Sequence, residues 1–357
     1  MARTRVAVLY GGQSVEHGVS INSARNIGQY LDRERFDPVF IGITPTGGWY
    51  HTPTVTKHIE QGSPLSVRLT GKGSWITSAG VSLEVDVVFP VLHGTGGEDG
   101  TVQGLLGVMD LPMVGTGVLG SALCMNKRIA KQLLERFDVP VVPYRVLYRT
   151  DPAPDFRELV NAVPVPFMVK AANLGSSVGV SKVRDAASYD AALADAFQYD
   201  DTVLIEEFVN AREIECAILG NDPPEASLPG EIVMNPKYEF YTFDAKYVDP
   251  DAVSIVVPAV LSADETATIQ SLSLRAYQVL QCQDFARVDL FLTRDGRIYV
   301  NEINTIPGFT NSSMYPMMWQ ERGIAFSDLI TRLIDCALNR YQKNRDLRRD
   351  FSSNLTY

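Results

Sequence analysis

Residues 286–308 read ARVDLFLTRDGRIYVNEINTIPG. Two runs rich in Val, Ile, Leu, Phe and Tyr flank the dipeptide Asp295-Gly296, which is typical of a two-residue β-hairpin turn. Such a turn pairs residues whose numbers add to a constant, so Arg294 would face Arg297. We therefore expect an antiparallel hairpin here, and the rest of the chain is organised around it.

Four polar residues farther from the turn fall on one face of this hairpin. The same pairing places Asp289 opposite Glu302 and Arg287 opposite Asn304, because side chains alternate by two along a strand. Two directly opposed carboxylates, with β-carbons about 5 Å apart, repel each other unless a cation neutralises them. Divalent cations bind oxygen ligands of this kind, although alternating charges also occur on a hairpin face that is merely solvated.

The length of the turn controls which residues share a face, because a shift by one residue turns a strand over. A four-residue loop preserves the pairing. A three-residue loop at 294–296 needs a compensating β-bulge to keep Asp289 and Glu302 together. The predicted cation site thus depends on the geometry of this turn.

The length and composition indicate a globular protein of two or three domains, because 357 residues exceed one ordinary core. Hydrophobic residues make up 45% and charged residues 21% of the chain. The formal net charge is −10 and the sequence pI is about 5.0, which argues against nucleic acid as the main partner. A local basic pocket for a nucleotide is compatible with that charge.

The cysteines and histidines indicate neither disulfides nor a zinc site. The cysteines lie far apart without a C-x-x-C pair, so we expect free thiols and a cytoplasmic protein. No apolar run approaches the roughly eighteen residues of a membrane span, and we expect no signal segment at the start. The residues in question are Cys124, Cys216, Cys282 and Cys336, with His17, His51, His58 and His93.

The first part of the chain has the β-α-β pattern of a parallel sheet. The motif GTGVLG at 115–120 does not lie between a first strand and a first helix, so we interpret it as a glycine-rich linker, not a dinucleotide site. The expected elements are strands at 5–10, 38–44, 86–92 and 111–115, helices from about 20 and at 100–110, and a loop with a hairpin at 45–80.

The remainder has an α+β pattern, and we expect the first change of domain near Ser121. An amphipathic helix at 326–341 is predicted near the end of the chain. The other expected elements are helices at 126–138, 186–199 and 264–280, and strands at 144–148, 167–171, 178–183, 203–208 and in the segments REIECAILG, GEIVMN and SIVVPAV.

A glycine- and serine-rich segment, NLGSSVG at 173–179, lies between two expected strands. Backbone N–H groups and hydroxyls at such a hairpin tip suit phosphate oxygens. Lys170 precedes the segment, and Lys127 opens the preceding helix. A flexible hairpin without a ligand explains the segment equally well.

Two further loops follow strands of the expected parallel sheet, where ligands bind in such sheets. GGQSVEH at 11–17 contains Glu16, which is suited to a substrate ammonium group or simply to the start of a helix. HGTGGEDG at 93–100 begins with His93, and a lone histidine is more often structural. The loop at 306–314 brings the Gly308 amide and hydroxyls beside the hairpin, where they can bind an anion. Together these loops and the hairpin indicate a Mg²⁺-dependent, nucleotide-using enzyme that acts on a small zwitterion.

The chain resembles the D-alanine–D-alanine ligase family of ATP-grasp enzymes over essentially its whole length. The motifs that carry the resemblance, in the family's order, are GGQSVEHGVS, HGTGGEDGTVQG, CMNK, GSSVGVSKV, NAREIECAILGND, DAKY, RVDLFL and NEINTIPGFTNSSMYP. The resemblance implies an α/β (α+β) fold of three domains, with ATP clamped between the central and C-terminal ones. The expected boundaries are 1–122, 123–210 and 211–345, followed by a polar tail at 346–357.

The resemblance also implies the reaction: ATP phosphorylates the carboxylate of one D-alanine, the amine of a second attacks the acyl phosphate, and phosphate leaves. Two Mg²⁺ ions, which Mn²⁺ can replace, would neutralise charge on the transferring phosphoryl group. The implied metal ligands are Asp289, Glu302 and Asn304, and the implied nucleotide contacts are Lys127, Lys170, Ser177, Glu206, Phe208, Val209, Glu213, Lys246 and Phe291.

At the reacting centre, the resemblance assigns oxyanion stabilisation to Arg287 and the Gly308 amide, where one donor is typically worth about 3 kcal/mol. Glu16 would hold the first ammonium group and connect through Ser176 to Tyr247. Ser313 and the Met314 amide would bind the second carboxylate, and His93 would lie near the substrates.

Two positions depart from the family's usual pattern without removing a functional group: Ala171 stands where proline is frequent, and Gly18 where an acid is frequent. The resemblance further implies a homodimer formed through the N-terminal domain. The alternatives are a ligase that uses D-serine or D-lactate as the second substrate and a catalytically silent ATP-grasp protein. Tyr247 argues against the D-lactate form, and the retained metal and oxyanion residues argue against the silent form.

Overall fold

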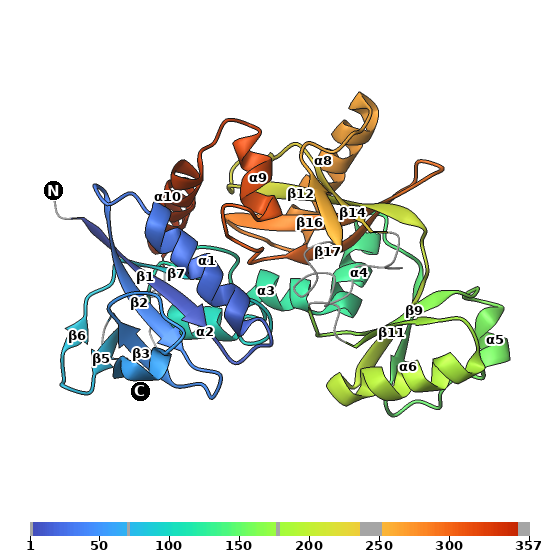
Figure 1. The fold of residues 1–357 in the computed structure, drawn as a ribbon, viewed down its shortest axis with the longest axis horizontal. Helices are drawn as coiled ribbons and strands as arrows, with labels where there is room; N and C mark the ends of the chain where they lie inside the picture. The colour runs from blue at the N-terminus through green and yellow to red at the C-terminus, as the bar shows by residue number, and fades with distance from the viewer. Residues whose placement is uncertain (1–2, 70–71, 176–178, 236–251, 349–357) are drawn as a thin grey trace, which may run out of the picture.

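The computed structural model describes residues 3–69, 72–175, 179–235 and 252–348. Within these residues the chain forms three β-sheets with helices packed against them (Figure 1). This mixed architecture confirms the predicted α/β class.

The N-terminal sheet has seven strands in the order β6-β5-β4-β3-β2-β1-β7. Its centre is β1 (Thr4–Gly11), parallel to both β2 (Phe36–Ile43) and β7 (Val87–Pro90), with α1 (His17–Tyr30) connecting the first two. The side chains of β1 are apolar and buried from Val6 to Tyr10, which is why this strand lies inside the sheet. The predicted β-α-β opening is confirmed.

Of the loop with a hairpin predicted at 45–80, the paired strands of the hairpin are present at 63–68 and 74–77, but most of the remaining region is not a loop and extends the same sheet. Pairing continues through four short antiparallel strands whose side chains are mostly half-buried or exposed, so the sequence has no clear alternation there. The elements are β3 (Trp49–Thr52), the 3₁₀ helix η1 (Ile59–Gln61), β4 (Ser63–Arg68), β5 (Ser74–Thr77) and β6 (Ser82–Leu83).

The linker predicted at 115–120 is also wrong, because α3 (Val118–Met125) begins within it, after α2 (Thr101–Val108). A β-carbon on Gly120 would lie 2.4 Å from the Gln281 carbonyl oxygen, so this glycine permits close helix packing. The strand predicted at 111–115 is reduced to a single bridge between Met113 and Val88.

The central sheet is antiparallel, in the order β10-β9-β11-β8, and lies apart from the N-terminal sheet (Figure 1). Helices α5 and α6 pack on it, and α4 precedes it in the chain. Of these, α5 is not predicted from the sequence. The elements are α4 (Lys127–Arg136), β8 (Tyr144–Tyr148), α5 (Phe156–Val160), β9 (Phe167–Ala171), β10 (Val180–Val183), α6 (Ala186–Tyr199) and β11 (Thr202–Glu207).

The C-terminal sheet has the order β15-β14-β12-β16-β17, with β13 paired to β12. The capping box between Ser262 and Glu265 begins α8, whose buried side packs against this sheet. The elements are β12 (Ala211–Leu219), β13 (Glu225–Ala226), β14 (Gly230–Met234), β15 (Val253–Val256), α8 (Ala263–Val279), β16 (Phe285–Thr293), β17 (Ile298–Asn304), α9 (Met314–Gln320) and α10 (Phe326–Arg345).

The hairpin β16–β17 is present, but its turn has three residues, not two. Thr293 pairs with Arg297, and Gly296 has a left-handed φ of 83°, so the predicted pairing of Arg294 with Arg297 is wrong. A bulge between Asp289 and Leu290 then corrects the register.

Beyond the bulge, Asp289 lies opposite Glu302 and Arg287 opposite Asn304, as the sequence predicts. The extra residue of the bulge is Asn301. The compensating bulge that a three-residue turn requires is therefore present.

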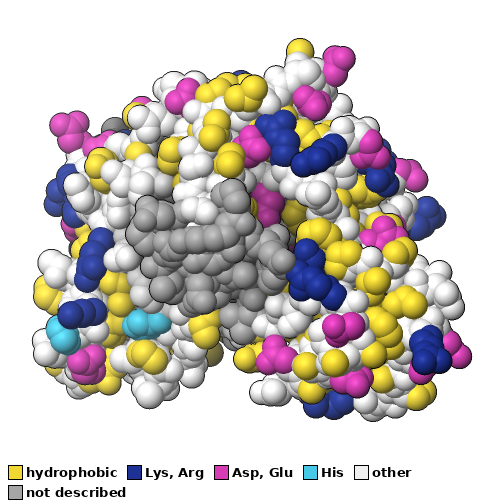
Figure 2. Space-filling model, turned by 45° about the vertical axis from the view of Figure 1, so that its right-hand side comes forward, with side chains coloured by type: hydrophobic (Ala, Val, Ile, Leu, Met, Phe, Trp, Pro, Cys, Tyr) yellow, Lys and Arg dark blue, Asp and Glu magenta, His cyan; other side chains and the backbone are white. Residues whose placement is uncertain are grey.

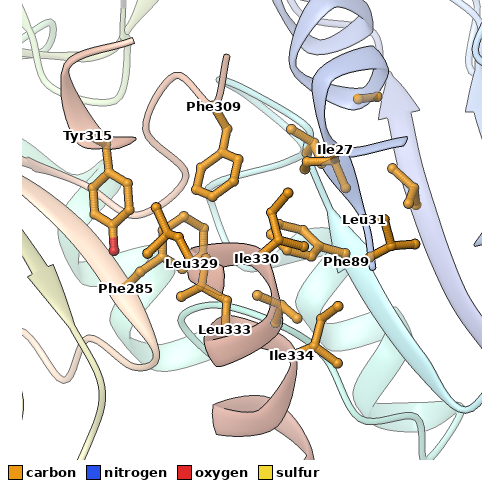
Figure 3. Packing of buried hydrophobic residues seen from close by; sticks show 14 of the residues in the cluster. Ile27, Leu31, Phe89, Phe285, Phe309, Tyr315, Leu329, Ile330, Leu333 and Ile334 are labelled. Atoms are coloured by element: carbon orange, nitrogen blue, oxygen red, sulfur yellow. The ribbon is translucent and has the colours of Figure 1, made fainter. Parts of the chain in front are cut away.

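Helix α10 joins the first and last parts of the chain through one hydrophobic cluster (Figure 3). Leu329 and Ile330 of α10 belong to the same buried cluster as Ile27 of α1 and Phe89 of β7. Phe309, from the loop after β17, lies in contact with Phe89, with ring centroids 5.8 Å apart. The N-terminal and C-terminal sheets therefore share a core.

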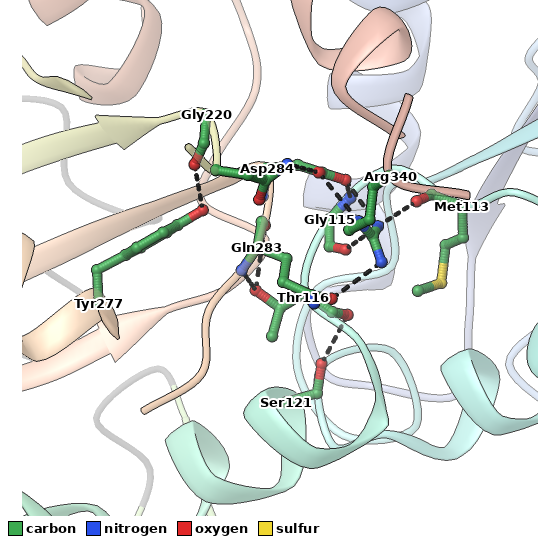
Figure 4. A network of polar contacts seen from close by, with 10 residues as sticks. Met113, Gly115, Thr116, Ser121, Gly220, Tyr277, Gln283, Asp284 and Arg340 are labelled. Carbon is green, nitrogen blue, oxygen red and sulfur yellow. Dashed lines mark hydrogen bonds and ion pairs between the residues drawn. The ribbon is translucent and has the colours of Figure 1, made fainter. Parts of the chain in front are cut away.

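A polar network crosses the same junction (Figure 4). Arg340 of α10 donates to the Asp284 carboxylate at 2.8 Å and to the carbonyl oxygens of Met113 and Gly115 at 2.7 and 2.8 Å. Asp284 is fully buried and also accepts from the Gly115 amide at 2.9 Å. This network, which we call the Arg340 junction, fixes the segment between α2 and α3 to the start of β16.

Lys and Arg side chains are interspersed with Asp and Glu on the face in Figure 2. Among the helices of the described ranges, none is both long enough and apolar enough to cross a bilayer.

Candidate active site

A cavity of about 370 Å³ lies between the central and C-terminal sheets. Its walls come from β9 to β11 on one side and from β12, β14, β16 and β17 on the other. The structure brings together here nine of the residues expected to bind nucleotide or metal: Lys127, Lys170, Glu206, Phe208, Val209, Glu213, Phe291, Asp289 and Glu302.

The polar face of the hairpin forms one end of this cavity. The Arg287 guanidinium donates to both carboxylate oxygens of Asp289, at 2.7 and 2.8 Å, and Asn304 Nδ2 donates to the same carboxylate at 2.9 Å. Glu215 Oε2 lies 3.1 Å from Arg287 Nε. The predicted common face of the four residues is confirmed, and Glu215 is an addition that the sequence reasoning missed.

Two lysines expected to contact phosphates point into the cavity from different elements. Lys127 opens α4, which Asn126 caps by accepting from the Ile129 amide, and its ammonium lies 3.8 Å from Glu302. Lys170, on β9, lies 2.7 Å from Glu206 Oε2 and 3.5 Å from Asn301 Oδ1. Both lysines are largely buried, which strengthens their interaction with an anion.

Glu206 is a buried carboxylate between two lysines. Burial alone would raise its pKa, but the ammonium groups of Lys131 and Lys170 outweigh burial and lower the pKa to about 2. Phe208 follows on the same segment, and Lys182 lies 3.6 Å from its ring centroid. This arrangement gives the cavity one ionised acceptor and one aromatic wall, which suits a nucleobase.

The loops after β1 and β7 reach the far side of the hairpin. His93 is buried, its Nδ1 donates to the Ile306 carbonyl at 2.8 Å, and Ser23 Oγ lies 3.0 Å from its Nε2. Burial lowers the pKa of His93, so the neutral ring accepts from the Ser23 hydroxyl. The carboxylate of Glu16 lies within 3.9 Å of the β-carbon position of Gly175, which lines the cavity.

Glu98 connects the loop after β7 to the loop after β17, and the sequence reasoning missed it. Its two oxygens accept from the amides of Gly94 and Ile306 at 2.7 and 2.9 Å. Burial, reinforced by the nearby Glu16 carboxylate, raises the pKa of Glu98 to about 8. The sequence does show an acidic residue in a glycine-rich loop after a buried strand, which could have pointed to this site. The loop contains both Glu98 and Asp99, however, and only the fold shows which of them reaches Ile306.

Comparison with known proteins is consistent with this geometry. The family model for the D-ala D-ala ligase N-terminus matches residues 5–116, and that for the D-ala D-ala ligase C-terminus matches residues 133–335. The chain belongs to the D-alanine–D-alanine ligase family. The predicted family and the ATP-grasp architecture are thereby confirmed.

Relatives and solved structures of this family align with nearly the whole chain. D-alanine–D-alanine ligase A of Salmonella typhimurium is 44% identical, over 98% of this chain and 99% of the relative. The D-alanine–D-alanine ligase structure from Coxiella burnetii has a TM-score of 0.84 and 35% identity, and covers 96% of this chain and 97% of that one. The VanG D-Ala:D-Ser ligase structure from Enterococcus faecalis has a TM-score of 0.86 and 34% identity, and the match covers 94% of this chain and 100% of that one.

The remaining family positions lie in the loop after β17 or outside the described residues. Ser313 precedes α9, and its hydroxyl lies 3.0 Å from the Thr310 amide, which donates to it. The hydroxyl also lies 3.2 Å from the β-carbon position of Gly308, and Met314 is buried as the first residue of α9. Four predicted residues lie outside the described residues: Ser176, Ser177, Lys246 and Tyr247.

Proposed function

We propose that this chain uses ATP to join two molecules of D-alanine into D-alanyl-D-alanine, a precursor for peptidoglycan. The observation that carries this proposal is that the expected ammonium-binding residue, Glu16, lies next to the cavity expected to bind the nucleotide. Arg287 holds Asp289, which lines the cavity, while the Glu16 carboxylate lies beside Gly175 at the same cavity. A nucleotide in the cavity and an amino acid held by its ammonium group can therefore meet at the hairpin.

The reaction proceeds in two steps. A carboxylate oxygen of the first D-alanine attacks the γ-phosphorus, and the bond to the β-phosphate oxygen breaks to leave ADP and an acyl phosphate. The amine of the second D-alanine then attacks the acyl carbon, gives up a proton, and inorganic phosphate leaves. Positioning and charge stabilisation supply most of the catalysis in such a transfer.

We assign nucleotide binding to residues that line the cavity and, from the family motifs, to Ser177 and Lys246, which lie outside the described residues. Lys127, Lys170 and Lys246 contact phosphates, and Glu213 takes the ribose. Glu206 accepts from the base beside Phe208 and Val209, and Phe291 and Ser177 complete the nucleotide site. The burial of Lys170 and Glu206 supports this assignment, because charge interactions are stronger away from water.

The residues on the hairpin face fit magnesium. In the described ranges no cluster of three or more His, Cys, Asp and Glu side chains forms a self-sufficient metal site. Mg²⁺ typically binds one or two carboxylates together with substrate phosphates, so Asp289 and Glu302 are sufficient. Asn304 donates through Nδ2 to Asp289, which leaves its Oδ1 as a third oxygen ligand. Two Mg²⁺ ions, or Mn²⁺ in their place, would supply positive charge to the transferring phosphoryl group.

We assign the reacting centre to groups beyond the cavity. Glu16 binds the ammonium group of the first D-alanine and connects through Ser176 to Tyr247. Arg287 and the Gly308 amide stabilise the oxyanion of the tetrahedral intermediate. Ser313 and the Met314 amide bind the second carboxylate. Neutral His93 holds the loop after β7 against Ile306, close to both substrates.

The wider assignments are a cytoplasmic homodimer with domains at 1–122, 123–210 and 211–345 and a tail at 346–357. Exposed apolar residues on α2 and α3 support a dimer through the N-terminal domain: Val108 is 68%, Val118 51% and Leu119 61% exposed. Light scattering of the wild type and of Leu119→Glu tests this, because a charge in place of one of these exposed apolar side chains should give monomers.

A phosphate-release assay tests the proposed function and its rivals. Purified protein is mixed with ATP and Mg²⁺ and then with D-alanine alone, with D-alanine plus D-serine, with D-alanine plus D-lactate, or with no acceptor, and the products are separated by mass. We expect D-alanine-dependent phosphate release and D-alanyl-D-alanine. The similarity to a D-Ala:D-Ser ligase makes the mixed D-alanine and D-serine arm informative. Absence of D-alanine-dependent release refutes the proposal.

A further inference from the structure

Three charged side chains form a row that runs from the wall of the cavity into the protein interior. Lys131 Nζ, on α4, lies 3.1 Å from Glu206 Oε1, and Lys170 Nζ, on β9, lies 2.7 Å from Glu206 Oε2. The side chains of Lys131 and Glu206 are each 2% exposed. A lysine buried this deeply is rare unless it is paired, so its place beside Glu206 requires an explanation.

The two lysines differ in what they face. Lys170 and Glu206 line the cavity, whereas Lys131 lies outside its walls. Lys131 also donates to the Val142 carbonyl at 3.3 Å and lies 5.4 Å from the Tyr144 ring centroid. Lys131 is therefore fixed, and Lys170 is the partner that can turn toward a ligand.

A phosphate in the cavity changes the balance of this row. When Lys170 turns to a phosphate oxygen, Glu206 loses the closer of its two counterions. A carboxylate left buried without a counterion is strongly destabilised, and it would retain Lys170 or take up a proton. Lys131 prevents both outcomes, because it remains 3.1 Å from the other oxygen.

We propose that Lys131 is a positioning residue for nucleotide binding: as the permanent counterion of Glu206, it allows Lys170 to move to the phosphates. This inference rests on the proposed nucleotide roles of Lys170 and Glu206. The Glu206 pKa of about 2 is consistent with it, because two cations hold the proton off this carboxylate. Glu206 then stays ionised for the base while Lys170 serves the phosphates.

The test is Lys131→Met, which keeps most of the side-chain volume and removes the charge. Calorimetry without amino acids should show ADP affinity reduced about tenfold or more, with adenosine affinity within about twofold of wild type. Adenosine has no phosphate, so its binding does not require Lys170 to leave Glu206. A side chain needed only for packing would weaken both ligands equally.

A second background distinguishes charge from packing. In Glu206→Gln the carboxylate is absent, so adding Lys131→Met should change ADP affinity less than twofold. This double variant also replaces the charged pair with a neutral one and provides a folded comparison if Lys131→Met alone is unstable. Equal losses of ADP affinity in both backgrounds, or equal losses for ADP and adenosine, would overturn the inference.

The proposed function fails separately. A wild type that binds ADP without D-alanine-dependent turnover refutes the ligase assignment and leaves the role of Lys131 standing. A wild type that turns over, with Lys131→Met binding ADP normally, refutes only the role of Lys131.

Discussion

Replacing Arg340 with methionine should destabilise the junction between the N-terminal and C-terminal sheets by about 3–5 kcal/mol. The guanidinium makes hydrogen bonds of 2.7 to 3.2 Å to two carbonyl oxygens, to Gln283 and to Asp284 (Figure 4). Asp284 is 0% exposed and Arg340 18%, so solvent screens this pair little. Losing one partner of such a pair leaves a buried charge, which accounts for most of the expected loss.

The matched control lies one turn farther along α10. Lys343 pairs with Asp222 at 3.5 Å, with both side chains more than two thirds exposed, so Lys343→Met should change stability by less than about 0.5 kcal/mol. Both variants remove one positive charge from the same helix. They differ in burial and in the number of hydrogen bonds that the side chain makes.

Urea unfolding followed by tryptophan fluorescence measures the difference. The three tryptophans, Trp49, Trp75 and Trp319, lie in the N-terminal and C-terminal units that Arg340 joins. The KM for D-alanine should also rise in Arg340→Met, because the loops that we propose to hold the substrate come from both units, while the affinity for ADP stays unchanged. Equal stability of Arg340→Met and Lys343→Met would refute the reasoning.

Three further outcomes test the site. Glu302→Ala should leave the far-UV circular dichroism spectrum intact and abolish turnover, and a near-normal rate would contradict the metal assignment. The pKa of Glu98 is about 8 in the folded protein, above its usual 4.5, so between these two pH values the unfolded state loses its proton first and the folded state becomes less stable as pH rises. The free energy of unfolding of Glu98→Gln, relative to that of the wild type, should therefore increase by about 2–4 kcal/mol from pH 5 to pH 8. Urea unfolding measures it, and a difference between the two proteins that does not change with pH would contradict this. Deleting Asn301 should give a regular hairpin within about 1–2 kcal/mol of wild-type stability, and loss of folding would show that the bulge does more than correct register.

Where local patterns decide structure, the sequence predicts it closely. The strands at Tyr144–Tyr148 and Phe167–Ala171 have the predicted bounds, as does helix α6. Helix α6 buries a stripe at helical spacing and β9 is a short run of buried residues, so the local pattern carries the information. The short strands β3 to β6 lack that periodicity, because most of their side chains are half-buried or exposed and their pairing extends the edge of the sheet.

Whether a charged side chain is buried is harder to predict from the sequence than the position of a strand or helix. In KRIAKQLLER, Lys131 has the same appearance as its exposed neighbours, yet it is almost fully buried beside Glu206. Glu98 likewise differs from the adjacent Asp99 only in the fold, where it reaches across to Ile306. Residues that the sequence reasoning missed are therefore those whose partners lie on other elements.

In the hairpin, the predicted pairing of Asp289 with Glu302 is correct although the predicted two-residue turn is wrong. The three-residue turn shifts β17 by one residue, which alone would place Asn301 opposite Asp289. Val300 and Ile303 are both buried in the same core although they are three residues apart, which a regular strand does not allow. The bulge therefore places Asn301 and Glu302 together on the cavity side. The core selects the register, and the pairing of Asp289 with Glu302 follows from burial of the apolar face rather than from the turn.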